Sequence, residues 1–381
     1  MGGLCPRCRG RGWCGRDTCV WSRVTARVRE RLKGDVEGYV RTAHVTWRGY
    51  PEVYAAPGLG SPVPDEADAL ADLDFERVVE VSGTTLRKGE RRHARREPYD
   101  LSHPDVEAAV SCRPVEGTLE VERTISGPES SPFVGPLVKG ELEIDGTPRV
   151  PRPLEKLHED DVKAREAVVE LVLRRGLDEN LVARALSLGL LGLDRRLVPT
   201  RWAVAAVDSM VSEHLLREVA DLPPADDWKV LRGELYGNEM WVLAGPGPYS
   251  LKLIEVYVPG APWSSEEVTV LEDSEGPGRP LREPEETGGA FLAVRTAVLE
   301  SMVGEGRSRS VTVIRVVKPE YPIPLGAWVI REAVRRAEEV GRFEDGEEAL
   351  GFLSERLKGP ARAALDRVDV GRQLTLDSFL Y

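Results

Sequence analysis

The sequence predicts an α+β protein of several domains, with a small cysteine-rich knuckle at one end and a flexible tail at the other. Three observations support this prediction. Segments with helical periodicity are interspersed with segments in which apolar and polar residues alternate, and no internal repeat organises them. Four of the five cysteines lie between residues 5 and 19. A stretch rich in proline, glycine and glutamate, 274–289, is the best internal boundary. The expected domains are therefore 1–21, 22–284, 285–364 and 365–381.

The composition is that of a soluble globular protein, with 41% hydrophobic and 30% charged residues in a chain of 381. The sequence contains no apolar run long enough to span a membrane and no export signal, so we expect a cytoplasmic protein. The formal net charge is −12, whereas general affinity for nucleic acid requires clustered cations that displace counterions from phosphates. A role on DNA would therefore require one local basic surface or a partner that recruits the chain.

The cysteine-rich segment has the spacing of a metal site. Disulfides are unusual in a chain without an export signal, whereas four nearby thiolates can converge on one tetrahedral ion. We predict a structural Zn²⁺ ion, with an iron–sulfur cluster as the alternative. Arginines within the segment either offset the negative charge of the site or contact DNA. The predicted ligands are Cys5, Cys8, Cys14 and Cys19.

The segment after the knuckle begins with a predicted helix. Ser22 is a suitable N-cap, and Gly34 ends a stripe of apolar residues at helical spacing: Val24, Val28 and Leu32. Residues 48–66 are rich in turn formers, and residues 75–81 have the composition of a buried strand. A strand at 117–125 and a loop at 126–136 follow.

One stretch between these two strands is strongly basic. It contains six cations within ten residues: Arg87, Lys88, Arg91, Arg92, Arg95 and Arg96. The stretch is either a solvated face of a helix or loop, or a patch that contacts phosphates. For the second interpretation, the nucleic-acid contacts are expected at Arg87, Lys88, Arg91 and Arg92.

Helical periodicity dominates from Glu159. One helix is predicted to reach Arg175, where Gly176 breaks it, and a second helix to reach Leu188. The quartet at the start of this segment, His158-Glu159-Asp160-Asp161, is interpreted as an acidic helix N-terminus rather than a metal site, because carboxylates interact favourably with the exposed amides there.

A longer helix is predicted from Arg201 to Val219, with Thr200 as its cap. Asp208 falls within its apolar stripe, where a carboxylate requires either an ion-pair partner or a function. The stripe consists of Val204, Val207, Val211 and Leu215.

The remaining chain is predicted to mix strands and helices. A β-hairpin is expected from 230–236 and 240–244, joined by a Gly237-Asn238 turn. Beyond it we expect strands at 251–258 and 310–317 and helices at 290–303, 325–340 and 347–358.

The last nine residues have the spacing of a clamp-binding peptide. Gln373 is the only glutamine of the chain, and three apolar residues follow it at the spacing of such a peptide: Leu376, Phe379 and Leu380. A short turn would place these apolar side chains together, while the amide fills a polar pocket. The pattern resembles the peptide by which DNA-processing proteins bind the sliding clamp PCNA, although leucine occupies its second aromatic position. The alternative is a terminus that folds back onto the protein.

Taken as a whole, the chain resembles the archaeal Nre family of DNA repair proteins. The matching strings are Leu4-Cys5-x2-Cys8-x-Gly10-Arg11, Pro199-Thr200-Arg201-Trp202, Gly237-Asn238-x-x-Trp241-Val242, Pro319-Glu320-Tyr321 and Pro324-Leu325-Gly326-x-Trp328, together with the tail. The resemblance implies a zinc finger on the four knuckle cysteines, a PCNA-interacting tail and a response to DNA damage. It implies no catalytic residues.

Two functional hypotheses follow. The first is an accessory or scaffold protein of DNA repair, which PCNA recruits through the tail and whose knuckle or basic stretch contacts DNA or another repair protein. The second is a metal-dependent nuclease or other DNA-processing enzyme that uses dispersed carboxylates such as Asp208, since no nucleotide-binding loop or hydrolase motif is present. A zinc-containing RNA-binding protein with an incidental tail is a third reading.

Overall fold

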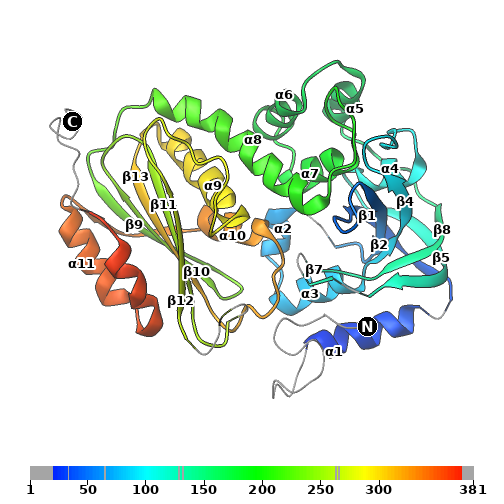
Figure 1. Ribbon diagram of the computed structural model, residues 1–381, viewed down its shortest axis with the longest axis horizontal. Coiled ribbons are helices and arrows are strands. Elements are labelled where there is room, and N and C mark those ends of the chain that lie inside the picture. The colour runs from blue at the N-terminus through cyan, green and yellow to red at the C-terminus, as the bar shows by residue number, and fades with distance from the viewer. Residues whose placement is uncertain are drawn as a thin grey trace. The chain divides into compact units, whose positions relative to one another are not determined.

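A computed structural model describes residues 20–32, 34–63, 66–127, 129–130, 133–261, 264 and 267–370 (Figure 1). The chain divides into two compact units. The first unit comprises the residues up to Val211 together with Ile323–Gly326, and the second comprises Ser212–Pro322 and the residues from Ala327 onward. Each unit combines a sheet with helices, which confirms the α+β class. The boundary expected between residues 284 and 285 lies inside the second unit.

The sheet of the first unit closes on itself. Strand β1 (Val36–Val45) pairs antiparallel with both β2 (Glu52–Gly60) and β5 (Val115–Ser126). Strand β8 (Leu137–Ile144) pairs antiparallel with β5 and parallel with β3 (Leu86–Lys88). Because β3 also pairs antiparallel with β2, these five strands form a small closed barrel.

Two features adapt the barrel strands to closure. The register of β1 against β2 shifts between Val40 and Thr42, and such an irregularity bends a strand and increases its twist. Strand β4 (Glu90–His93) continues β3 beyond Gly89 and pairs with the first half of β2.

The helix α4 (Pro104–Ala109) contacts β1, β2 and β8. Fully buried barrel residues include Val40, Val53, Leu59, Leu86 and Leu119.

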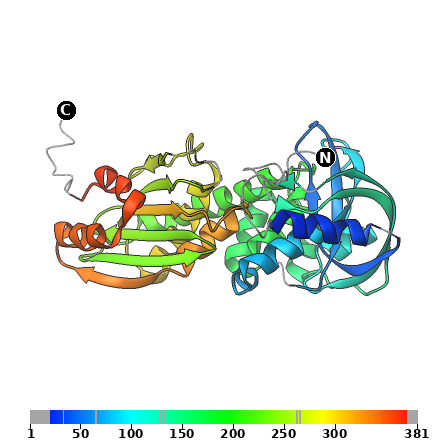
Figure 2. The same ribbon diagram turned by 90° about the horizontal axis from the view of Figure 1, so that it is seen from below.

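Two helices of the first unit pack side by side (Figure 2). Helix α1 (Val20–Arg31) buries Val24 and Val28, as the sequence predicts. Helix α3 (Phe75–Thr84) occupies residues for which a strand was expected, and that prediction is wrong. The Asp74 carboxylate accepts a hydrogen bond from the Arg77 amide at 2.8 Å, so an N-cap starts a helix despite the valine-rich composition.

Three further expectations for the first unit need correction. The turn-rich segment 48–66 contains strand β2, and α2 (Ala67–Ala71) follows it. The acidic quartet does not begin a helix, because His158 and Glu159 end α5 (Arg152–Glu159), which has a proline in its first turn. The helices that follow are α6 (Ala164–Val169), the π-helix η1 (Glu170–Arg174) and α7 (Glu179–Ser187). The expected loop at 126–136 contains the short pair β6 (Glu129–Ser130) and β7 (Phe133–Val134).

Helix α8 (Thr200–Ala220) forms where it was predicted, and it crosses from the first unit into the second. Its buried stripe includes Val207, Val211 and Leu215, and Asp208 lies within this stripe at 1% exposure, as expected from the helical period.

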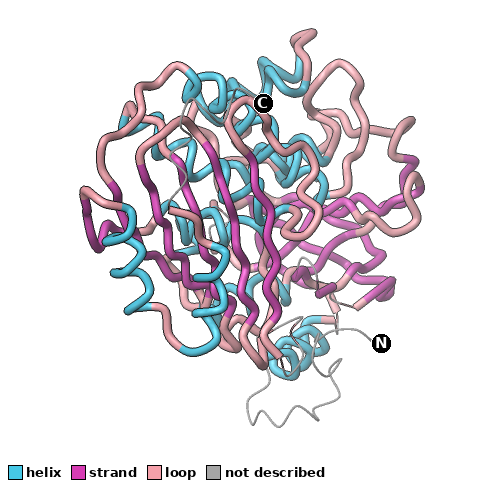
Figure 3. Tube along the Cα trace, turned by 60° about the vertical axis from the view of Figure 1, so that its left-hand side comes forward, coloured by secondary structure: helices cyan, strands magenta, loops and turns pink. Residues whose placement is uncertain are grey.

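The second unit is built on a six-stranded sheet between two layers of helices (Figures 1 and 3). All neighbouring strands are antiparallel except β11 and β13. The strands in spatial order are β12 (Thr269–Glu275), β11 (Ser250–Tyr257), β13 (Ser310–Val317), β10 (Asn238–Gly245), β9 (Trp228–Leu235) and β14 (Glu338–Phe343).

Helices cover both faces of this sheet. On one face lie α9 (Gly289–Glu305) and α10 (Ala327–Arg335), and on the other lie α11 (Gly346–Arg356) and the 3-10 helix η2 (Gly359–Arg367). The core under α11 includes Trp241, Ile254, Ile314, Leu353 and Leu357.

The predicted elements of the second unit are confirmed with two corrections. The hairpin forms, but its turn consists of Tyr236 and Gly237, both with positive φ, and Asn238 already belongs to β10. The helix expected over 325–340 ends at Arg335, because residues from Glu338 pair as an edge strand with β9. No helix among the described residues is long and apolar enough to cross a bilayer.

Candidate nucleic-acid interface

The knuckle and the tail lie outside the described residues. The zinc prediction at Cys5, Cys8, Cys14 and Cys19 and the clamp prediction at Gln373, Leu376, Phe379 and Leu380 therefore stay predictions. The basic stretch and its surroundings are described.

The first half of the basic stretch is internal to the barrel. The Arg87 side chain is only 2% exposed, donates from Nε to the Gly135 carbonyl at 2.7 Å, and lies 3.2 Å from a Glu129 carboxylate oxygen. Burial lowers the pKa of Arg87, and the charge of Glu129 opposes that shift. Lys88 Nζ lies 2.8 Å from an oxygen of the buried Asp105. These two cations are thus engaged within the fold.

The second half of the basic stretch faces water. The Arg91 side chain is 68% exposed and lies 3.6 Å from Glu52, which makes this an exposed and weak ion pair. Arg92 stacks on the ring of Tyr99 at 3.9 Å and is paired with Glu90. Arg95 and Arg96 are exposed after β4, and no described carboxylate forms an ion pair with either. The available cations of this stretch are therefore Arg91, Arg95 and Arg96.

Segments far apart in sequence meet beside these cations. The amide of Ala94 donates to the carbonyl of Pro51 at 2.8 Å, and the carbonyl of Ala94 accepts from the amide of Leu197 at 2.8 Å. The Val45 amide donates to the Thr200 hydroxyl, also at 2.8 Å. These bonds bring together the β1–β2 loop, the turn after β4 and the start of α8.

A set of five aromatic and cationic residues lies at this junction, and we call it the aromatic–arginine cluster. It comprises Trp47, Arg48, Tyr50, Arg201 and Trp202. The guanidinium groups of Arg48 and Arg201 lie 5.5 and 5.2 Å from the centre of the Trp47 ring. Trp202 meets Tyr50 edge to face at 5.3 Å between ring centres and is 45% exposed. Arg48 and Arg201 are exposed and form no ion pair with a described carboxylate.

This arrangement is chemically suited to nucleic acid. Guanidinium groups without acidic partners can bind phosphates, and exposed aromatic rings can stack on bases. The sequence interpretation missed the cluster, although each arginine adjoins a tryptophan in the dipeptides Trp47-Arg48 and Arg201-Trp202. Only the fold shows that these dipeptides, 154 residues apart in sequence, touch each other.

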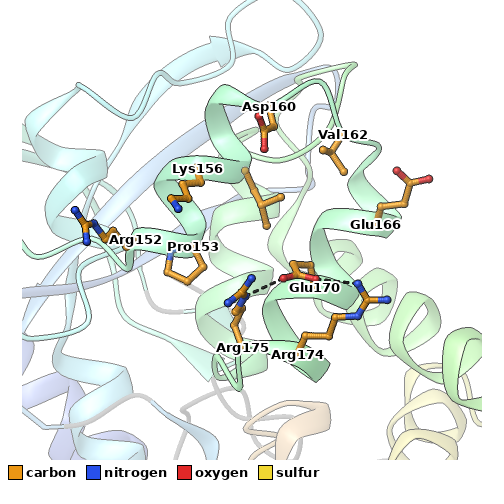
Figure 4. Close-up of a pocket in the computed structure, with 10 residues that line it drawn as sticks. Arg152, Pro153, Lys156, Asp160, Val162, Glu166, Glu170, Arg174 and Arg175 are labelled. Carbon is orange, nitrogen blue, oxygen red and sulfur yellow. Dashed lines mark hydrogen bonds and ion pairs between the residues drawn. The ribbon is translucent and has the colours of Figure 1, made fainter.

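A separate cavity of about 530 Å³ lies among α5, α6 and η1 (Figure 4). Its lining is of mixed charge, with four cations and three carboxylates: Arg152, Lys156, Arg174, Arg175, Asp160, Glu166 and Glu170. Glu170 accepts from Arg175 at 2.8 Å and from Arg174 at 3.1 Å, and the hydrogen bond from Arg175 is the main cause of its lowered pKa. Because Arg174 and Arg175 share the one carboxylate of Glu170 and the lining is of mixed charge, we assign no ligand to this cavity.

Among the described residues, no three His, Cys, Asp or Glu side chains gather where they could hold a metal ion. His158 is buried, with Nδ1 3.0 Å from the Leu190 carbonyl and Nε2 3.3 Å from Arg195. The His158 ring is therefore held by contacts within the fold. The described residues contain nothing that favours the nuclease hypothesis.

One of the family-typical strings has a structural explanation. The side-chain oxygen of Asn238 accepts two hydrogen bonds from Arg315, at 3.0 and 2.6 Å, inside the second unit. Arg315 is also paired with the buried Glu255, which accepts from the Tyr257 hydroxyl at 2.9 Å. Burial opposes the charge of Arg315, but Glu255 raises the pKa of Arg315 above its ordinary value. This string therefore fixes a buried polar network rather than an exposed site.

Comparison with known proteins places the chain in a family. The N-terminal model of archaeal Nre proteins matches residues 13–264, and the C-terminal model matches residues 278–379. The chain is 31% identical over 392 residues to the DNA repair protein NreA of Archaeoglobus fulgidus, which covers 98% of each protein. It is 28% identical over 399 residues to the DNA repair protein NreB of the same organism, covering 99% of this chain and 100% of that protein.

A third relative matches over a shorter region. The DNA repair protein NreA of Haloferax volcanii is 34% identical over 253 residues, which is 63% of this chain and 60% of that protein. No solved structure matches the chain. The two family models match residues 13–264 and 278–379, which is most of the sequence, and the chain therefore belongs to the archaeal Nre family.

Proposed function

We propose that this protein is a DNA repair factor that the sliding clamp PCNA recruits to DNA through the C-terminal peptide. The proposal rests on one observation: the chain is similar, over 98% of its length, to a protein named for DNA repair. The C-terminal family model extends to residue 379, so the shared region includes Gln373, Leu376 and Phe379. The matched region thus reaches into the peptide and ends one residue before Leu380.

The peptide acts as a plug in this proposal. Leu376, Phe379 and Leu380 enter one apolar pocket of the clamp, and the Gln373 amide binds beside it. Recruitment by a peptide fits the net charge of −12, because most of the protein surface is not attractive to phosphates. The clamp then supplies the proximity to DNA, and the few local cations supply the contact.

Calorimetric titration of the full-length protein with the clamp of its own organism tests this proposal. We expect saturable binding that Phe379→Ala weakens roughly 10- to 100-fold, because about 1.5–3 kcal/mol of apolar burial is lost. Thr375→Ala is the matched control, since this residue lies between the anchors, and it should change the affinity little. Absence of saturable binding, or an affinity that Phe379→Ala leaves unchanged, would overturn the proposal.

We further propose a structural zinc ion on Cys5, Cys8, Cys14 and Cys19. Metal analysis of the purified protein should give about one zinc per chain. Cys8→Ser should lower that content, and the exposed and distant Cys112→Ser should not. Iron in place of zinc, with visible absorbance, would replace this proposal by the cluster alternative.

A further inference from the structure

We infer that the barrel of the first unit binds single-stranded DNA, with unpaired bases stacking at the aromatic–arginine cluster. The inference rests on the proposed function for the choice of DNA as the ligand. It goes beyond that proposal by naming the site and the form of DNA.

The first argument is topological. In chain order, the barrel strands are β1, β2, β3 with its continuation β4, β5 and β8. Numbered one to five, they pair in the circular order one, two, three, five, four and back to one, and only strands three and five are parallel. The helix between strands three and four, α4, packs on the barrel. These are the strand order and directions of the OB-fold, a barrel that commonly binds oligonucleotides.

The second argument is that the aromatic–arginine cluster includes the loop at which OB-fold barrels bind their ligands. Barrels of this kind bind their ligands on the face of strands two and three and at the loop between strands one and two. Here that loop carries Trp47, Arg48 and Tyr50. On the adjoining strands, Arg91 of β4 stands directly opposite Tyr54 of β2. Topology and side-chain chemistry therefore point independently to one surface.

The third argument concerns Trp202. An indole ring that is 45% exposed leaves a large apolar surface in water. Its neighbour Arg201 stacks on Trp47 of the loop, so the start of α8 extends the barrel surface. A base that stacked on Trp202 would cover this apolar surface.

The ring surfaces and the cations together select the form of DNA. Bases in a duplex are already stacked on one another, so an aromatic side chain gains most from an unpaired base. Arg48 and Arg201 lie against the Trp47 ring, and Arg95 and Arg96 follow Ala94, whose backbone is bonded to the same junction. These four arginines are exposed and have no described acidic partner, so they would follow the DNA backbone. A duplex would use the same cations and leave the rings unused.

Fluorescence anisotropy with the full-length protein and labelled oligodeoxythymidine of about 15 nucleotides tests the inference. We expect affinity at least about tenfold higher for the single strand than for a duplex of equal length. Trp202→Ala and Arg201→Ala should each weaken single-strand binding by about five- to tenfold or more. Thermal unfolding of both variants should match that of the wild type, because both side chains are exposed.

Two controls match these changes in chemistry. Arg217→Ala removes an exposed arginine near the other end of α8, and Val340→Ala removes exposed apolar surface in the second unit. Neither should alter DNA affinity. Equal affinity for duplex and single strand, tighter binding of the RNA of matched sequence, or no effect of Trp202→Ala would each overturn the inference.

Clamp titration of the same variants separates this inference from the proposed function. Trp202→Ala and Arg201→Ala should bind the clamp as the wild type does, because the peptide is unchanged. Loss of single-strand binding with intact clamp binding locates the DNA site. A protein that binds the clamp but no oligonucleotide would overturn the inference and leave the recruitment proposal standing.

Discussion

At the scale of single residues, the first unit holds ionisable side chains in its interior at positions that have a structural cause. His44 on β1 is 5% exposed, and its pKa is well below the ordinary value, first because of burial and second because of the nearby Arg87 charge. Arg87 in turn donates hydrogen bonds to the Gly135 carbonyl and the Glu129 carboxylate. Burial and the positive charge of Arg87 thus both disfavour protonation of His44.

His44 should make the stability of the protein depend on pH. The unfolded histidine binds a proton below about pH 6.5, whereas the folded residue stays neutral, so stability is present above that pH and is lost as pH falls. Between pH 6.5 and the lowered pKa of the folded His44, its contribution to the free energy of unfolding should fall by up to about 1.4 kcal/mol for each pH unit. Denaturant titrations at pH 7.5 and 5.5 should show a smaller difference in His44→Gln than in the wild type.

The control for this measurement is His93→Gln, a partly exposed histidine on β4. It should keep the wild-type difference between the two pH values. An identical pH dependence in His44→Gln and the wild type would contradict the assignment.

A second residue-scale test concerns the buried ion pair of the second unit. Glu255→Gln leaves the Arg315 charge without its carboxylate at a site where both side chains are almost fully buried. We expect a loss of about 3–5 kcal/mol in the free energy of unfolding, measured by chemical denaturation. Glu338→Gln, an exposed position on β14, should stay within about 0.5 kcal/mol of the wild type. A small loss in Glu255→Gln would show that the pair contributes little.

Helical period was enough to place Asp208 in a buried stripe, because that argument needs only neighbours three and four residues apart. The same reasoning could not find Trp202 as a partner of Tyr50, since their meeting depends on the Ala94 and Thr200 hydrogen bonds between distant segments. Local residues were accessible from the sequence, and the assembled site was not.

At the scale of elements, the long helix α8 was predicted well, and the barrel strand β2 was not. Strand β2 contains Pro57, Gly58 and Gly60, which have the composition of a turn. In the barrel, a Cβ atom on Gly58 would lie 2.6 Å from Thr42 Cγ2 and 2.8 Å from Thr85 Cγ2, so glycine is required by close packing rather than by a turn. The contacts that require glycine at position 58 form only in the folded barrel, so the sequence could not show them.

The N-cap of α3 gives an element-scale prediction. Asp74→Ala removes the acceptor for the Arg77 amide and should lower the free energy of unfolding by about 1 kcal/mol. Asp74→Asn, which retains an acceptor, should lose much less, and denaturant titration of both variants measures the difference. Equal losses in the two variants would indicate that the cap is not the cause.

At the scale of the whole molecule, an acidic protein is expected to contact DNA at a few points only. If four arginines meet phosphates, the logarithm of single-strand affinity should fall against the logarithm of salt concentration with a slope of about −3. The double variant Arg95→Ala/Arg96→Ala should make that slope less negative by roughly 1.4. Anisotropy titrations over a range of salt concentrations measure both slopes, and a slope near −10 would instead indicate an extensive phosphate interface.

The return of Ile323–Gly326 to the first unit has a practical consequence. The Phe133 amide donates to the Pro324 carbonyl at 3.1 Å, so this short segment belongs to the architecture of residues placed nearly two hundred positions earlier. No single point of truncation can therefore yield an intact N-terminal half. A fragment that stops at residue 211 would lack a piece of its own structure, and point substitutions within the complete polypeptide are the sounder route to dissecting it.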